Sequence, residues 1–309
     1  MKPLKYAIIF TLLFISGIVV ITSFAYADVE VWVGDFEHGP MPLTRENSES
    51  IWYEQANLAE VVSAPAPVRI GSYAVKFFVD RINSPYSYRS MIIPKGDPPS
   101  PYEWAVIQDI GKHWWYGFST YFPASWTADN IWELVAQMHG RPDLDIGEDY
   151  RNPFLGFFTD GENITIHNIW DAKRNTFESG SRVYDGERDL WTGPILREQW
   201  TDWVMHAKWS YQDDGIIEIW RNGVQIVNSP GPNCFNDERG GYFDIGIYKG
   251  WRDRYDPVGM VSTRLIYFDE IRIAGENAGY SDVAPGNGDR KKPQAPIMLL
   301  LRSAVHDSE

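Results

Sequence analysis

Short apolar and aromatic segments separated by turn residues run through most of this chain, and long stretches of helical periodicity are scarce. Segments of this kind predict β-strands, which we expect at 30–33, 73–79, 114–122, 131–139, 163–170, 203–211, 242–248 and 264–273. The clearest local signal is Asn222-Gly223, because this dipeptide supplies the positive φ angles of a type I′ hairpin between 215–220 and 224–227. The chain is therefore expected to be all-β.

The first 27 residues have the features of a secretory signal peptide. Lys2 and Lys5 precede an apolar run over 6–21, and Ala25-Tyr26-Ala27 forms a small-x-small cleavage site. The run is short for a membrane span, which favours cleavage after Ala27 over an uncleaved anchor. We therefore expect a secreted or periplasmic protein that starts at Asp28 and makes no membrane contact after cleavage.

The charge of the chain limits its partners. The formal net charge is −14, and removal of the two leader lysines makes it more negative. This argues against non-specific binding to nucleic acid or to anionic membrane surfaces. An anionic substrate would need a local basic patch. The single cysteine, Cys234, excludes an internal disulfide, so the fold depends on its core.

One domain is expected over residues 28–284. Within it, the proline-rich stretch 94–101 predicts a loop, and the polar stretch 171–188 predicts a second long excursion. Residues 285–309 lose the strand pattern and begin with a run of glycine, charged residues and proline. That composition predicts a linker-like or disordered tail.

Two short strings about a hundred residues apart carry side chains suited to chemistry, Gln137-Met138-His139 and Asp244-Ile245-Gly246-Ile247-Tyr248. Each lies in an alternating segment, so its polar residues can project from one sheet face into a shared groove. A histidine base opposite a tyrosine acid suits β-elimination at a uronic acid sugar, which also needs a group that neutralises the carboxylate. Hydrolysis would instead use two carboxylates.

Six strings, taken in order, resemble the secreted polysaccharide lyases of the heparin lyase I type, with more distant similarity to alginate and glucuronan lyases. They lie at 88–90, 115–123, 137–140, 203–210, 246–249 and 267–272. The resemblance extends from about residue 35 to about residue 285 and implies a concanavalin A-like β-jelly roll of two antiparallel sheets. It also implies an anionic, uronate-containing polysaccharide as partner and no organic cofactor.

The resemblance assigns His139 as the base, Tyr248 as the acid, and Gln137 with Arg89 as binders of the uronate carboxylate. The planar fork of Arg89 can hold a carboxylate through two bonds. Three residues that follow Tyr248 are further substrate-binding candidates, namely Lys249, Trp251 and Arg252. Trp251 would stack on a sugar face, and the two cations could equally lie in a solvated loop.

Two positions depart from the family pattern. Asp244 stands where relatives often carry a lysine, and Met91 stands where they often carry a glutamate. A carboxylate at position 244 would repel a uronate. These departures keep open a second class of function, a non-catalytic carbohydrate-binding module on the same scaffold.

Acidic residues suggest two further alternatives. The string from Asp143 to Glu148 is close to the carboxylate signature of laminarinase-like glycoside hydrolases, with aspartate where those enzymes place a nucleophilic glutamate. Asp35, Glu37 and Asp269 could bind a structural calcium ion if their strands are neighbours, or could simply be acidic residues at a sheet edge. No supporting partner for His167 is evident in the sequence.

Overall fold

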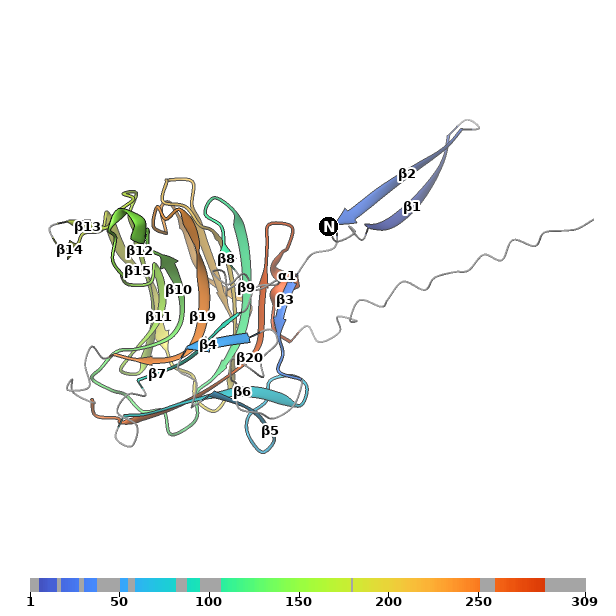
Figure 1. The fold of residues 1–309 in the computed structure, drawn as a ribbon. Helices are drawn as coiled ribbons and strands as arrows, with labels where there is room; N and C mark the ends of the chain where they lie inside the picture. The colour runs from blue at the N-terminus through green and yellow to red at the C-terminus, as the bar shows by residue number, and fades with distance from the viewer. Residues whose placement is uncertain are drawn as a thin grey trace, which may run out of the picture.

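The computed structural model describes the side chains of residues 31–37, 59–81, 88–94, 108–178, 180–250 and 259–286. For residue 107 and for residues 6–15, 18–27 and 51–54 it describes the backbone alone. Two antiparallel sheets of eight strands each form a sandwich (Figure 1). The predicted all-β jelly-roll architecture is confirmed.

The first sheet, called the groove sheet below, carries the candidate site. Its strands follow the order β15 (Gly186–Pro194), β12 (Asn163–Trp170), β11 (Leu155–Asp160), β10 (Glu133–Arg141), β19 (Arg239–Lys249), β7 (Arg89–Pro94) and β4 (Ile51–Glu54), and β8 (Ile107–Gln108) pairs with β19. The central pair, β10 and β19, joins the two motif strings predicted to share a groove.

The second sheet, called the back sheet, has the order β18 (Val224–Pro230), β17 (Ile216–Arg221), β16 (Trp200–Lys208), β9 (His113–Tyr121), β20 (Thr263–Ala274), β6 (Tyr73–Asp80) and β5 (Ala59–Ser63), and β3 (Val31–Gly34) pairs with β20. The Asn222-Gly223 turn between β17 and β18 has φ angles of 51° and 79°, as a type I′ hairpin requires. The short helix α1 (Tyr280–Val283) packs on the outer face of this sheet, next to Val204 and Ala274.

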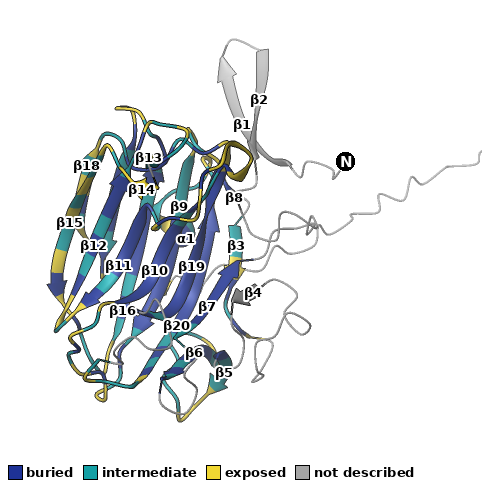
Figure 2. Ribbon diagram, turned by 60° about the vertical axis from the view of Figure 1, so that its left-hand side comes forward, coloured by how far each residue is buried: buried dark blue, intermediate teal, exposed yellow. Residues whose placement is uncertain are grey.

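Aromatic side chains fill the space between the sheets. Phe118 of the back sheet contacts Phe157 and Phe243 of the groove sheet, with ring centroids 5.7 Å and 5.6 Å apart. Edge-to-face and tilted pairs of this kind stabilise a core beyond the burial of their area. The central strands of the groove sheet are accordingly buried along most of their length (Figure 2).

Two smaller features complete the described chain. Within the predicted excursion 171–188, β13 (Phe177–Glu178) and β14 (Ser181–Arg182) form a short hairpin, and a 3-10 turn lies at Leu144–Ile146. Near the start of the chain, β1 (Tyr6–Ile15) and β2 (Ile18–Ala27) pair only with each other.

The signal peptide and the disordered tail stay predictions. The β1–β2 pairing leaves cleavage after Ala27 a prediction, and the tail from residue 287 onward lies outside the described residues. None of the helices in the described part of the chain has the length and apolar character of a transmembrane helix.

Candidate active site

A groove of about 1080 Å³ lies over the face of the groove sheet that points away from the core. Four predicted site residues line it together: Arg89, Gln137, His139 and Tyr248. They come from three adjacent strands, β7, β10 and β19. The structure therefore brings the predicted acid, base and carboxylate binders into one groove.

Strand register explains why these side chains share a face. Gln137 stands opposite Asp244, and His139 stands opposite Tyr242. Since side chains alternate along a strand, the intervening residues of β19 point the other way, and Phe243, Ile245 and Ile247 lie in the core. The groove face of β19 thus carries Tyr242, Asp244 and Tyr248, and its opposite face is apolar.

Gly246 allows β7 to approach β19 closely. Its φ is +141°, and a Cβ atom there would lie 2.1 Å from the carbonyl oxygen of Ser90. Only glycine fits this combination of backbone angle and contact. The close approach places Arg89 beside Tyr248, with the guanidinium carbon 5.0 Å from the centroid of the phenol ring.

Asp244 occupies the position between the two predicted carboxylate binders. Its buried carboxylate accepts a hydrogen bond of 2.8 Å from Gln137 Nε2 and one of 3.3 Å from Arg89 Nη2. The aspartate that departs from the family pattern is therefore hydrogen-bonded to both predicted carboxylate binders. An internal carboxylate takes up donors that were expected to hold the carboxylate of the substrate.

His139 is held as a neutral imidazole. Burial lowers its pKa to about 4, and the nearby charges of Arg89 and Arg151 act in the same direction. Nδ1 lies 2.7 Å from the carbonyl oxygen of Gly140, which can only accept, so Nδ1 carries the proton and Nε2 keeps its lone pair. The ring also stacks on Tyr242, with centroids 5.5 Å apart.

His139 and Tyr248 lie at different points along the direction of the strands. Tyr248 pairs with Leu134, which precedes His139 by five residues on β10. At the rise of a β-strand, five residues span roughly 16 Å, so Tyr248 and His139 are separated by about that distance along the strands. Both side chains must therefore lean toward a sugar that lies between them if they act on the same residue.

Lys249 is not in the groove, which corrects the prediction that it contacts substrate. Its side chain is fully buried, pairs with Asp129, and lies 3.0 Å from Glu133 Oε1. Glu133 also pairs with Arg264 from the back sheet. Alternation after Tyr248 turns Lys249 inward, where it joins an ionic cluster between the sheets. The other two candidates on this segment, Trp251 and Arg252, lie outside the described residues.

The acidic string from Asp143 to Glu148 secures a loop beside the groove, and neither of these two carboxylates lines the groove. Glu148 is buried and accepts hydrogen bonds from the backbone nitrogens of Asp143 (2.8 Å) and Thr176 (3.0 Å). Burial alone would raise the pKa of Glu148, but these hydrogen bonds outweigh it and lower the pKa. The side chain also pairs with Arg151.

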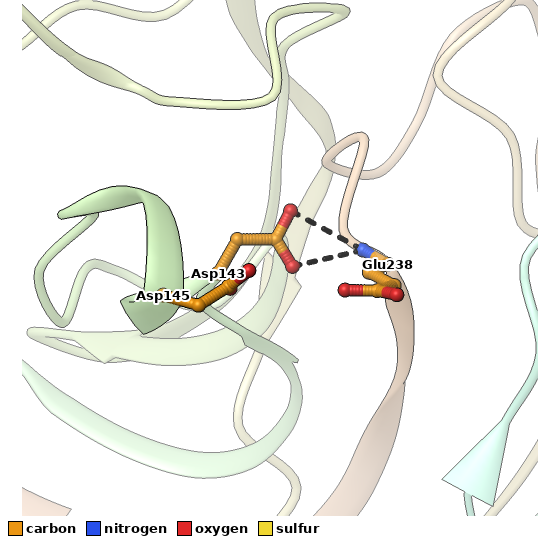
Figure 3. Close-up of side chains that lie close together, drawn as sticks. All are labelled: Asp143, Asp145 and Glu238. Carbon is orange, nitrogen blue, oxygen red and sulfur yellow. Dashed lines mark hydrogen bonds between the residues drawn. The ribbon is translucent and has the colours of Figure 1, made fainter.

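Asp143 is likewise held by hydrogen bonds and an ion pair. Its carboxylate accepts from the Glu238 backbone nitrogen at 3.0 Å and pairs with Arg174 at 2.7 Å. The carboxylates of Asp143, Asp145 and Glu238 lie within 4.8 Å of one another (Figure 3). The arrangement supports a loop-securing role for this string in place of the hydrolytic one considered from the sequence.

The residues proposed for calcium bind backbone amides. Asp269 is buried and accepts from the backbone nitrogens of Arg69 (2.9 Å) and Ile70 (3.2 Å). Glu37 accepts from Ser72, and Asp35 accepts from Glu37 itself. Among the described residues, these three carboxylates do not form a ligand cluster. Burial raises the pKa of Asp269 to about 7.

A line of aromatic rings in the groove was not predicted from the sequence. Tyr248 contacts Trp132 at 5.5 Å, Trp132 contacts Phe158 at 5.8 Å, and Phe158 contacts His167 at 6.3 Å. All four residues line the groove. Rings in this position can stack on the apolar faces of sugars.

His167 also has the partner that the sequence did not reveal. Its Nδ1 lies 2.8 Å from Asp189 Oδ1, because β12 pairs with β15 in a register that places the two residues opposite each other. The proximity depends on strand pairing, and no sequence motif between the two residues predicts it.

Comparison with known proteins agrees with this architecture. An endo-β-1,4-glucuronan lyase from the fungus Trichoderma reesei is similar with a TM-score of 0.60 and 17% identity, over 81% of this chain and 99% of that one. This likeness shows the fold. No curated protein sequence matches the chain.

Two other solved structures are more distant. The catalytic domain of a glycoside hydrolase family 131 protein from Coprinopsis cinerea has a TM-score of 0.46 and 14% identity, over 78% of this chain and 92% of that one. The alginate lyase AlyA1 from Zobellia galactanivorans has a TM-score of 0.42 and 10% identity, over 65% and 77%.

A family model provides the assignment. The model described as polysaccharide lyase matches residues 37–272, which includes every strand that lines the groove. This match covers well over half of the chain. The protein therefore belongs to the polysaccharide lyase family.

Proposed function

We propose that this lyase cleaves a uronate-containing polysaccharide by β-elimination, with His139 as base and Tyr248 as acid. The observation that carries the proposal is the presence in one groove of a neutral imidazole and a phenol that lies beside a guanidinium. This combination supplies a proton acceptor, a proton donor and a positive charge.

The proposed reaction balances within these groups. His139 Nε2 takes the proton from C5 of the uronate, and the electron pair of that C–H bond forms the C4–C5 double bond. The C4–O4 bond breaks, and the hydroxyl of Tyr248 protonates the departing oxygen. Arg89 stabilises the negative charge that develops on the carboxylate during proton removal. Export of the protein through its N-terminal segment is part of the same proposal.

The decisive test follows the ultraviolet absorbance of the unsaturated uronate that β-elimination forms. Tyr248→Phe and His139→Gln should each lower kcat on a polyuronate by roughly 10²–10⁴-fold. Tyr150→Phe is the matched control, because Tyr150 lines the same groove but has no role in the proposed chemistry. New reducing ends without unsaturation would contradict β-elimination, and full activity of both variants would contradict the residue roles.

A further inference from the structure

The end of the groove over β12 and β15 carries two carboxylates. Glu187 and Asp189 on β15 line the groove with side chains that are each 64% exposed. His167 lies between them, 2.8 Å from Asp189 Oδ1 and 3.6 Å from Glu187 Oε2. This end of the groove is therefore rich in hydrogen-bond acceptors.

Nearby cations do not balance these carboxylates. Among the described residues that line this end, the permanent cation is Arg182, which donates to the backbone oxygen of Tyr150 at 2.8 Å and to Asn152 at 3.2 Å. Arg188 on β15 turns away and donates to the carbonyl of Pro232. Among the described residues that line this end, Glu187 and Asp189 therefore outnumber the permanent cation.

Strand register fixes where this acidic end lies relative to the proposed site. Gln137 pairs with Gly156, Gly156 pairs with His167, and His167 pairs with Asp189, so the four residues form one row across β10, β11, β12 and β15. At the spacing of β-strands, Gln137 and Asp189 are about 14 Å apart. A sugar chain bound across the sheet would place one residue near Gln137 and a later one over the acidic end.

The chemistry of the two ends differs accordingly. Carboxylates accept hydrogen bonds from sugar hydroxyls but repel a second carboxylate at the same place. Phe158 and His167 add ring faces on which a sugar can stack. An uncharged sugar satisfies all of these groups, whereas a uronate would add negative charge to an acidic surface.

We propose that the groove over β12 and β15 is a subsite for an uncharged sugar, so that this lyase prefers polymers that combine uronate with neutral residues over homopolymers of uronate. The proposal rests on the proposed function, since it names the substrate class of that same groove. Glu187 and Asp189 are the residues that set the preference.

The test compares two oligosaccharides of equal length, one built of β-1,4-linked glucuronic acid and one that alternates glucuronic acid with N-acetylglucosamine. Binding is measured by calorimetry in the Tyr248→Phe background, and cleavage is measured with the active enzyme. The double variant Glu187→Gln/Asp189→Asn should tighten binding of the homopolymer by roughly three- to tenfold and leave the alternating chain unchanged or weaker.

The control double variant, Asp213→Asn/Glu276→Gln, makes the same change in net charge at residues that do not line the groove. It should leave the ratio of the two affinities unchanged. Added salt should tighten binding of the homopolymer to the parent protein, because it screens repulsion. Tighter binding of the homopolymer than of the alternating chain, or no response to the double variant, would overturn this proposal. Preferred binding of the alternating chain without unsaturated product would overturn β-elimination alone.

Discussion

The side-chain amide of Gln137 donates a 2.8 Å hydrogen bond to the buried carboxylate of Asp244 on the neighbouring strand. Arg89 approaches the same oxygen at 3.3 Å. A uronate that binds near these donors must therefore share them with a carboxylate that belongs to the protein. This relationship makes position 244 the most informative site for mutation in the groove.

Asp244→Asn should lower the free energy of unfolding by about 1–3 kcal/mol, because Arg89 loses its charged partner in a largely buried position. The same change should lower KM for uronate substrates, since it removes a negative charge beside the donors. Urea unfolding and steady-state kinetics measure the two effects. Asp189→Asn, at an exposed carboxylate, should change stability by less than about 0.5 kcal/mol. Equal stability of Asp244→Asn and the parent would show that the contact contributes nothing.

Gly246→Ala should destabilise the protein by about 3 kcal/mol or more and reduce activity. The added Cβ would clash with the Ser90 backbone and push β7 away from β19, which separates Arg89 from Tyr248. Gly111→Ala is the matched control: its φ is also positive, at +80°, but no atom lies within 4 Å of the new Cβ. It should cost only about 1 kcal/mol of backbone strain. Thermal unfolding compares the two, and similar losses would contradict the steric explanation.

Lys249→Met should lower the free energy of unfolding by about 3–5 kcal/mol, because it removes one of the two buried cations, Lys249 and Arg264, that pair with both Asp129 and Glu133. Denaturant titration gives the loss, and kinetics at a temperature where the variant stays folded give KM. Since Lys249 lies on the core side of β19, KM should change little. A stable variant with a strongly raised KM would show instead that Lys249 reaches the groove.

The pKa of His139, about 4, is below its ordinary value of 6.5. Between these two values the unfolded chain binds more protons than the folded one, so stability falls as the pH drops through this window, by up to about 3 kcal/mol. A neutral base also predicts that kcat/KM persists below pH 6. NMR titration of the imidazole, assigned by the signal that His139→Gln removes, gives the midpoint directly. A midpoint near 6.5 would contradict the lowered pKa.

Local patterns in the sequence predicted much of this architecture. The Asn222-Gly223 hairpin depends on two adjacent residues, and the alternation in β10 and β19 depends on a few more. The direction of the Lys249 side chain could also have been predicted from alternation. Because Lys249 directly follows the groove-facing Tyr248, its side chain points to the core.

Interactions that depend on the register between strands could not be predicted from the sequence. The contact of Asp244 with Gln137 requires that β10 and β19 pair in one particular alignment, and a shift of one residue would have turned either side chain to the other face. The proximity of His167 and Asp189 depends in the same way on the pairing of β12 with β15. No short-range pattern in a single sequence encodes these alignments.

The pairing of β10 with β19 also affects how the site comes into being. Residues near 137 and 244 meet only after the chain between them has folded back, and such long-range closure is entropically costly and slow. No early local intermediate can therefore hold Gln137 and Asp244 together. During refolding, the recovery of activity should coincide with the last cooperative phase. Activity would then measure the fraction of the protein that has completed folding.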